Sequence, residues 1–246
     1  MEANVSREII GLSRLAERYG LTERQLDQLT RILDGLAADE LAPTTVRNPE
    51  QAVDVHLADS LVALELEVVS SARRLVDVGA GAGFPGLALA LALPASEVVL
   101  VESQVRKCRF IERLLAAAEV ENARVVCARA EAWPEGLGRS DVVTARALAA
   151  QPVVLEYAAP LLRADGTLLD WRGRRDAEEE AAAALAAEEL GLHLTEIRHV
   201  EPYAGALDHH LHLYKKVRET PVRYPRRPGM ARKRPLGGVS RSTPGC

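Results

Sequence analysis

The stretch LVDVGAGAGFPG, from Leu75 to Gly86, decides the fold of this chain. It begins as a short apolar run, continues with closely spaced glycines and ends with a proline that can open a helix. Glycine tolerates a positive φ and has no Cβ, so a nucleoside ligand can approach the backbone closely at such a turn. We therefore predict a strand, a cofactor-binding loop and a helix, in that order.

The sequence after Arg74 alternates between short apolar runs and helical stretches, which is typical of an α/β fold with a doubly wound parallel sheet. Two further strand candidates near the C-terminus are separated by a connection too short for a parallel crossover, so we predict an antiparallel pair that closes the sheet. The strand candidates are residues 75–78, 98–101, 124–127, 141–144, 167–171, 194–200 and 209–214, and the helical candidates are 85–93, 105–118, 152–162 and 176–190.

The N-terminal third is predicted to be helical. Apolar residues recur at helical spacing within residues 4–19 and again after Thr22, which forms a capping-box pattern with Gln25. A proline-bearing loop separates these helices from a third one, from about residue 49 to 64. The apolar stripes are Ile9, Leu12, Leu15 and Ala16, then Leu26, Leu29, Ile32, Leu33 and Leu36. The expected domains are an N-terminal helical cap over residues 1–68, the Rossmann-like sheet domain over 69–214 and a basic tail over 215–246.

The composition is that of a globular protein: 246 residues, 48% hydrophobic and 27% charged. The longest strongly apolar run, residues 87–93, is far too short to cross a bilayer, and charged residues interrupt any signal-peptide core within the first twenty. The cysteines Cys108, Cys127 and Cys246 are odd in number and widely spaced, which argues against a disulfide framework and a zinc site. We expect a cytoplasmic monomer with no membrane partner and no metal.

Charge is divided unevenly along the chain. From Tyr214 to Cys246 there are ten basic residues and one acid, Glu219, a net charge of +9 that leaves −13 for the remainder. Prolines stiffen this tail and Gly229 lets it turn, which suits a segment that lies along a surface. The charge favours a nucleic-acid partner over a merely solvated tail.

The glycine loop fits two kinds of cofactor. Gly79 starts a G-x-G-x-G pattern, and Gly81 starts a G-x-G-x-x-G pattern that is also found in dinucleotide sites. Glu102, at the end of the next strand, is placed to accept hydrogen bonds from both ribose hydroxyls of either cofactor. The antiparallel strand pair favours S-adenosylmethionine over NAD. So does Asp77, whose carboxylate could bind the ammonium group of a methionine moiety or could instead cap the glycine loop.

Five blocks carry a resemblance to a known family: HLADSL (residues 56–61), LVDVGAGAGFPG (75–86), ARAEAW (128–133), DVVTARAL (141–148) and TPVRYPRRPGMARKRPL (220–236). In this order they resemble the bacterial 16S ribosomal RNA (guanine-N7) methyltransferase G family, also called glucose-inhibited division protein B. The resemblance implies a class I methyltransferase that modifies one guanine, position 527 in the usual numbering, in the 530 loop of 16S ribosomal RNA or the 30S subunit. It also implies that S-adenosylmethionine is held by Gly79, Phe84, Ala130, Glu131 and Arg146, with Glu102 as the second-strand acid. The chain departs from the family at Arg172-Gly173, where a lysine often precedes the glycine.

Guanine N7 carries an in-plane lone pair and no proton, so it can attack a sulfonium methyl without a general base. Catalysis then comes from alignment of the reacting atoms. An arginine that bridged O6 and N7, the usual way of reading guanine, would block the reacting lone pair. We expect Arg146 to be the catalytic residue, facing cofactor or base and touching only O6 of the base. The alternative is a salt bridge to Glu131 or Asp141.

Several other polar groups have plain interpretations. His56, Asp59 and Ser60 share a helical face and lack a nucleophile elbow, so a catalytic triad is disfavoured, and the resemblance suggests that they pack the cap over the cleft. His210 and His212 lie on one strand face without an evident third ligand, which favours a structural role over a metal site.

Arg106, Lys107 and Arg109 could contact phosphates or form a solvated face. Two other functions remain open from the sequence: an NAD-dependent Rossmann oxidoreductase, and a non-catalytic RNA-binding protein.

Overall fold

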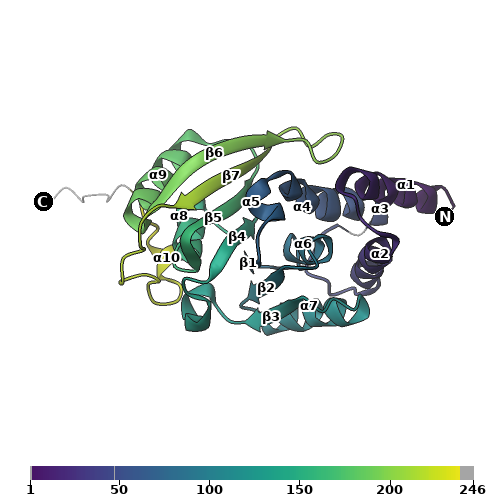
Figure 1. Ribbon diagram of the computed structural model, residues 1–246, viewed down its shortest axis with the longest axis horizontal. Helices are drawn as coiled ribbons and strands as arrows, with labels where there is room; N and C mark the ends of the chain where they lie inside the picture. The colour runs from purple at the N-terminus through teal and green to yellow at the C-terminus, as the bar shows by residue number, and fades with distance from the viewer. Residues whose placement is uncertain (1, 47, 239–246) are drawn as a thin grey trace, which may run out of the picture.

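A seven-stranded sheet runs through the middle of the protein in the order β3-β2-β1-β4-β5-β7-β6 (Figure 1). The computed structural model describes residues 2–46 and 48–238, and the side chains from residue 10 onward within them. Strands β1 to β5 are parallel to one another, and β7 is antiparallel to both β5 and β6. The strands are β1 (Arg74–Val78), β2 (Glu97–Glu102), β3 (Ala123–Cys127), β4 (Ser140–Arg146), β5 (Leu162–Arg172), β6 (Leu192–Val200) and β7 (His209–Lys216).

The sheet confirms the predicted fold class and the antiparallel pair. All seven predicted strands are present, and β5 begins earlier than expected because Leu162 pairs with Ser140 across an irregular register. The helices are α1 (Glu2–Tyr19), α2 (Glu23–Ala38), α3 (Pro49–Ala52), α4 (Asp59–Leu61), α5 (Glu67–Ser70), α6 (Gly86–Ala92), α7 (Val105–Ala117), α8 (Gln151–Ala158), α9 (Ala177–Leu190) and α10 (Met230–Lys233). No helix in the described ranges is both long and apolar enough to span a membrane.

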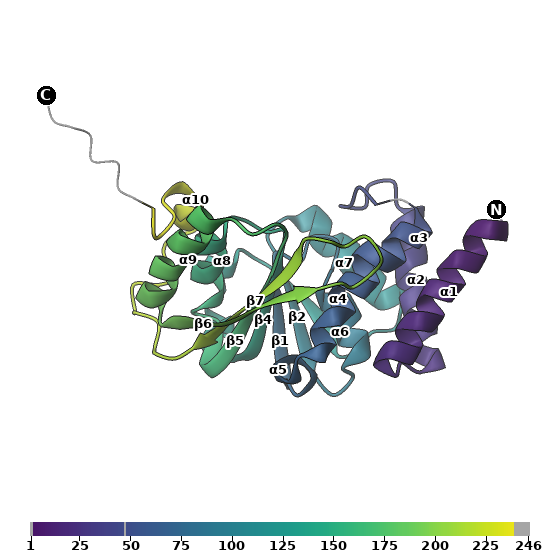
Figure 2. The ribbon, with the colours of Figure 1, turned by 90° about the horizontal axis from the view of Figure 1, so that it is seen from above.

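Two aliphatic clusters cover the two faces of the sheet. One joins α2 and α4 to α7 with side chains such as Leu75 and Leu100, and the other joins α8 and α9 with Val76 and Val99. The alternation follows from the two-residue period of a strand, which sends neighbouring side chains to opposite faces. Figure 2 shows the N-terminal helices at one end of the molecule and α8, α9 and α10 at the other.

The N-terminal helices follow the predicted patterns. Thr22 and Gln25 form the capping box that starts α2, and the predicted stripe on α2 is buried from Leu29 to Leu36. Leu12 and Leu15 of α1 are also buried, whereas the side chain of Ile9 lies outside the described ones.

The helix predicted over residues 49–64 is not regular. A π-helical turn, Val53–Ala58, separates α3 from α4, and a 3₁₀ turn, Val62–Glu65, follows. In the wide turn the N–H of Asp59 donates to the carbonyl of Asp54, five residues earlier. Such turns recur at functional sites because they change the direction of side chains and free carbonyl groups.

The basic tail lies along the protein's own surface. Arg226 forms an ion pair with the fully buried Glu156 of α8, and Tyr224 and Arg223 both bind Glu189 of α9. Lys216 belongs to β7, where its buried Nζ donates to two backbone carbonyls. The tail is therefore attached to α8 and α9 through Arg223, Tyr224 and Arg226, and Arg241 and Cys246 lie outside the described residues.

Candidate active site

The strand order reverses between β1 and β4, and a cleft lies beyond the carboxyl ends of the strands there, where open α/β sheets bind ligands. The cleft consists of two adjoining cavities of about 380 and 350 Å³. The first, the Ala130 cavity, is lined by Ala128 to Glu131 and Tyr157. The second, the Arg146 cavity, is lined by the glycine loop, Phe84, Glu102 and Arg146. Both share the lining residues Gly79, Ser103, Gln104, Leu148 and Arg232.

Gly79 is required where the two cavities meet. Its φ is +73°, and a Cβ added there would lie 2.4 Å from Cδ1 of Leu148. Gly81 also has a positive φ, +60°. An L side chain at Gly79 would be strained and would close the space that a nucleoside needs beside the backbone.

Glu102 is held rigidly at the end of β2. One carboxylate oxygen accepts from the N–H of Gly81 at 3.1 Å, and the other accepts from the N–H groups of Ser103 and Gln104 at 2.7 and 2.8 Å. The side chain lines the Arg146 cavity at its junction with the Ala130 cavity. This position fits a carboxylate that binds ribose hydroxyls, as the second-strand acid of nucleoside-binding sheets does.

Asp77 binds the end of the glycine loop through a buried carboxylate. It is fully buried, and its oxygens accept from the N–H of Gly86 at 3.0 Å and from the hydroxyl of Thr144 at 3.1 Å. Burial raises the pKa of Asp77 to about 6, against the opposing effect of these hydrogen bonds. Asp77 therefore fixes the start of α6, and a direct contact with a methionine ammonium group stays a prediction.

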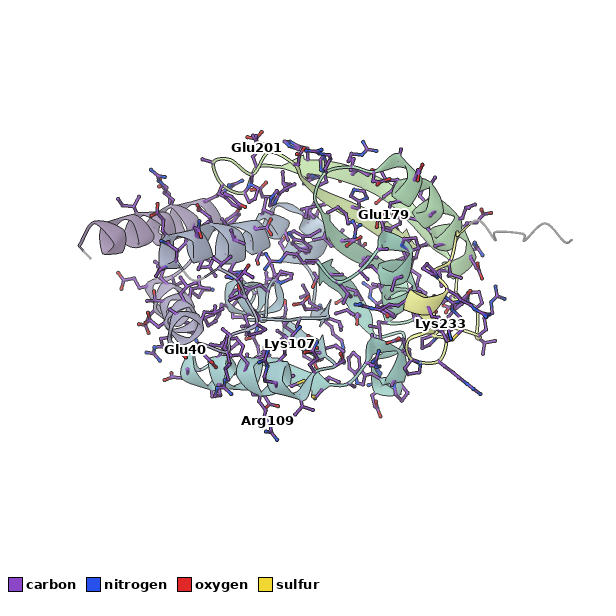
Figure 3. All side chains as sticks on the ribbon, turned by 180° about the vertical axis from the view of Figure 1, so that it is seen from behind. Glu40, Lys107, Arg109, Glu179, Glu201 and Lys233 are labelled. Carbon is purple, nitrogen blue, oxygen red and sulfur yellow. The ribbon has the colours of Figure 1, made fainter. Side chains whose placement is uncertain are left out.

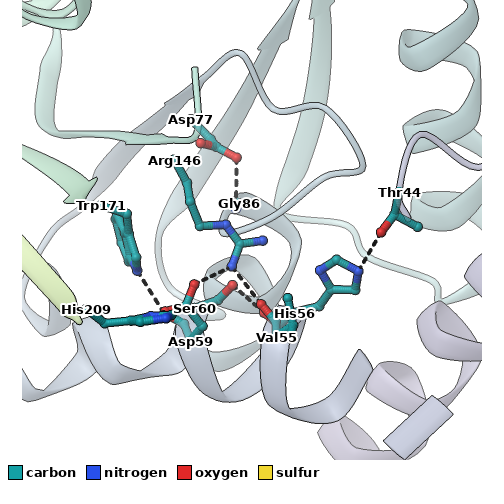
Figure 4. A network of polar contacts seen from close by, with 10 residues as sticks. All are labelled: Thr44, Val55, His56, Asp59, Ser60, Asp77, Gly86, Arg146, Trp171 and His209. Atoms are coloured by element: carbon teal, nitrogen blue, oxygen red, sulfur yellow. Dashed lines mark hydrogen bonds and ion pairs between the residues drawn. The ribbon is translucent and has the colours of Figure 1, made fainter. Parts of the chain in front are cut away.

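Arg146, at the end of β4, is anchored by the helical cap (Figure 4). Its Nη1 donates to Oδ2 of Asp59 at 2.7 Å and to the carbonyl of Val55 at 2.9 Å. The predicted alternative partners were wrong. Asp141 binds Arg163, and Glu131 accepts from the N–H of Gly229. The sequence could not show this, because the partner comes from the irregular helix some ninety residues earlier.

The HLADSL block closes the cleft, as the resemblance suggested. The imidazole of His56 stacks on the ring of Phe84 with centroids 4.8 Å apart, and its Nε2 lies 3.1 Å from the hydroxyl of Thr44. Burial, with a smaller effect of the nearby Arg146, lowers the pKa of His56 to about 4. The hydroxyl of Ser60 is bound to the carbonyl of His56, so these residues form no hydrolase triad.

The tail completes the cleft at the Ala130 cavity. The N–H of Gly229 donates to Glu131 at 2.9 Å, and Nη2 of Arg232 donates to the carbonyl of Leu148 at 2.9 Å. Arg232 lines both cavities, which the sequence did not indicate. Ala147 was also missed: its φ of +51° turns the chain between Arg146 and Leu148, which both line the cleft.

The two histidines that share a face of β7, His210 and His212, have protein partners. His212 is buried against Gln151, and Nδ1 of His210 lies 3.0 Å from the carbonyl of Gly173. Within the part of the chain that the structure describes, no three His, Cys, Asp or Glu side chains are grouped so that they could hold a metal ion. Cys108 and Cys127 are free thiols.

The strand order, the single antiparallel strand β7 and the nucleoside-sized cleft at the switch point define a class I methyltransferase, the class that uses S-adenosylmethionine as methyl donor. Residues 23–205 match the family model GidB, rRNA small subunit methyltransferase G. The chain belongs to this family, so the methyltransferase interpretation replaces the NAD-dependent alternative.

Curated relatives carry the same family name. The ribosomal RNA small subunit methyltransferase G of Symbiobacterium thermophilum is 39% identical over 78% of this chain and 82% of the relative. That of Desulfitobacterium hafniense is 34% identical over 94% of this chain and 98% of the relative.

Solved structures share the fold. A SAM-dependent methyltransferase from Aquifex aeolicus has a TM-score of 0.53 at 16% identity, covering 68% of this chain and 93% of that one. A mutant of the 16S rRNA (adenine(1408)-N(1))-methyltransferase from Catenulisporales acidiphilia has a TM-score of 0.51 at 20% identity, covering 62% and 88%.

Proposed function

We propose that this protein transfers the methyl group of S-adenosylmethionine to N7 of one guanine in 16S ribosomal RNA, position 527 in the 530 loop. The observation that carries the proposal is the chemistry of the Arg146 cavity. Among the described residues that line it, Glu102 is the one carboxylate, and three backbone N–H groups already bind it. His56, in the same wall, has its pKa lowered to about 4, so its imidazole is a weak base, and its Nε2 already faces the hydroxyl of Thr44.

A cavity whose carboxylate is already bound and whose imidazole is a weak base suits a nucleophile that has no proton to lose. Bound S-adenosylmethionine supplies an electrophilic methyl group, and N7 supplies the lone pair. The residues of the cleft then contribute by holding base and cofactor in line, which is worth about 7 to 11 kcal/mol in well-oriented reactions. Methylation of an exocyclic amine, by contrast, requires a proton acceptor.

The two cavities divide the cofactor between them. The Ala130 cavity takes the adenine beside Ala130 and Glu131, and Gly79 allows the nucleoside to approach the backbone. Glu102 binds the ribose hydroxyls at the junction of the cavities. The methionine portion then lies over Gly81 and Phe84 in the Arg146 cavity, with the methyl group directed toward the space in front of Arg146.

Ribosomal RNA reaches the cleft along a basic rim. The target base must be unstacked to enter the cleft, because side chains cannot reach base edges in the deep, narrow groove of A-form RNA. Lys107 lines the Arg146 cavity, and Arg109 points outward from α7 (Figure 3). On the tail, Arg227, Lys233 and Arg234 are exposed and have no hydrogen bond or ion pair through their side chains to any described residue. We assign phosphate contacts to these groups, and thus an RNA-binding role to residues 215–246, a cap role to 1–68 and catalysis to 69–214.

The proposal is tested by primer extension across the 530 loop, on ribosomal RNA from cells with and without the gene. N7-methylguanosine is converted to a strand break by reduction and aniline, so a stop at the nucleotide on the 3′ side of position 527 is expected only when the gene is present. A stop elsewhere, or none, would contradict the proposed target. A protein that bound 30S particles without transferring a methyl group would support the non-catalytic alternative.

A further inference from the structure

Arg146 enters the cleft with one end of its guanidinium already used. Both hydrogens of Nη1 are bound, one by Oδ2 of Asp59 and one by the carbonyl of Val55. Nε and Nη2 make no hydrogen bond with any described residue, and the side chain lines the Arg146 cavity. Nε and Nη2 therefore remain available to a ligand, because Asp59 and Val55 occupy Nη1.

Asp59 is itself held from three strands (Figure 4). Its Oδ2 binds Arg146 of β4, its Oδ1 lies 2.9 Å from Nδ1 of His209 at the start of β7, and its main-chain carbonyl accepts from Nε1 of Trp171 of β5 at 2.8 Å. The π-helical turn before α4 places Val55 and Asp59 together against the guanidinium. Asp59 is buried, with 7% of its side chain exposed, and that of Arg146 is 16% exposed. Both charges are thus fixed in position rather than solvated.

The bonds to Nη1 limit how Arg146 can contact a guanine base. Arginine commonly grips guanine by donating to O6 and N7 together, through two nitrogens. If Nη1 and Nη2 made that grip here, the N7 lone pair would be covered and could not attack the methyl group. With both Nη1 hydrogens bound to the cap, the end-on grip through Nη1 and Nη2 is closed, and Nε and Nη2 are the two nitrogens left to face the base.

We propose that Asp59 is a positioning residue that withholds Nη1 of Arg146 from the target base and so prevents the end-on grip through Nη1 and Nη2 that would cover N7. The inference rests on the proposed function, because it assumes that the reacting atom is N7 of guanine. It assigns Asp59 no contact with substrate or cofactor: Asp59 acts through Arg146.

The test compares Asp59→Leu with Asp59→Asn. The two replacements have similar shape, but only asparagine can still accept from Nη1. Methyl transfer to unmethylated 30S particles is measured at saturating S-adenosylmethionine, with kcat and KM for the particles determined separately. Asp59→Leu is expected to lower kcat on the order of 100-fold, as displaced reacting groups do. Its KM should be unchanged or lower, because the freed Nη1 strengthens the grip on guanine. Asp59→Asn should restore most of kcat.

His209→Gln is the control, since it disturbs the other side of Asp59 and leaves Nη1 bound. This variant should change kcat by less than about threefold. Wild-type kcat in Asp59→Leu would overturn the inference. So would a raised KM with unchanged kcat, or equal losses in the Leu and Asn variants. If the wild-type product is methylated at an atom other than N7, the proposed function fails instead, and the two failures are told apart by nucleoside analysis of the wild-type reaction.

Discussion

The ion pair between Arg226 and Glu156 attaches the basic tail to α8, and its two partners should respond unequally to removal. Glu156 is fully buried, whereas 23% of the side chain of Arg226 is exposed. Nε of Arg226 donates to Oε1 of Glu156 at 2.7 Å, and Nη2 binds the other oxygen and the carbonyl of Arg234. Arg226→Met therefore leaves a carboxylate in the interior with no counter-charge. Glu156→Gln leaves a guanidinium that can turn toward water.

We expect Arg226→Met to lower the free energy of unfolding by about 3 to 5 kcal/mol, the usual cost of stranding one member of a buried pair. In a chain of this length that corresponds to a fall in Tm of roughly 6 to 20 °C. Glu156→Gln should cost about 1 to 2 kcal/mol, the range for a lost hydrogen bond. The double variant Arg226→Met with Glu156→Met should be more stable than Arg226→Met alone.

Thermal unfolding followed by circular dichroism measures these differences in stability. Isothermal titration calorimetry measures the affinity of each variant for S-adenosylmethionine. Gly229 and Arg232 reach Glu131 and Leu148 of the cleft, so detaching the tail should also weaken S-adenosylmethionine binding in Arg226→Met below its Tm. Equal losses of stability for the two single variants would refute the reasoning, because burial would then not determine the cost. So would a double variant that is less stable than Arg226→Met alone.

Three further predictions concern the cleft, the tail and the interior. Gly79→Ala should lower the free energy of unfolding by about 1 to 2 kcal/mol, because a residue with a side chain is strained in the left-handed region. Its Cβ should also lower the affinity for S-adenosylmethionine in calorimetry, because it meets Leu148 in the wall of the cleft. Replacing Arg227, Lys233 and Arg234 together by glutamine should reduce the slope of log affinity for 30S particles against log salt by up to about 2, at ~0.7 per lost phosphate contact. Burial raises the pKa of Asp170 to about 7 from its ordinary 3.8, so the folded state keeps a proton that the unfolded state loses, and this group's contribution to stability falls as pH rises from about 4 to about 7. Relative to wild type, Asp170→Asn should therefore gain stability over that interval and show a level difference above it, in chemical denaturation at a series of pH values.

Each of these has a clear contrary result. Wild-type affinity in Gly79→Ala would mean that Leu148 moves aside without cost. An unchanged salt slope would remove the RNA-binding role from the three tail residues. A pH-independent difference between Asp170→Asn and wild type would mean that Asp170 is ionised in the folded protein throughout the interval.

Much of the fold could be predicted because it depends on local patterns. The apolar runs located all seven strands, and the short link before His209 required β7 to run antiparallel to its neighbour. The capping box at Thr22 located the start of α2. These signals are readable because strand and helix periods, and the length of a connection, are properties of neighbouring residues.

The residues of the candidate site could be predicted only where they belong to a recognisable sequence motif. The glycine loop and Glu102 line the cleft, as their spacing suggested, and Arg146 lies at the end of β4 facing it. The partner of Arg146 was not predictable, because Asp59 meets it through a π-helical turn that no apolar period signals. Arg232 was likewise counted among the tail charges, since nothing in a basic run shows which member returns to the cleft.

The most direct test of the central claim is the product of a purified reaction. Unmethylated 30S particles are incubated with the protein and isotopically labelled S-adenosylmethionine, and the RNA is digested to nucleosides for mass spectrometry. We predict about one label per particle, all of it in N7-methylguanosine. Label in a methylated exocyclic amine or ribose, or no label at saturating donor, would contradict the account.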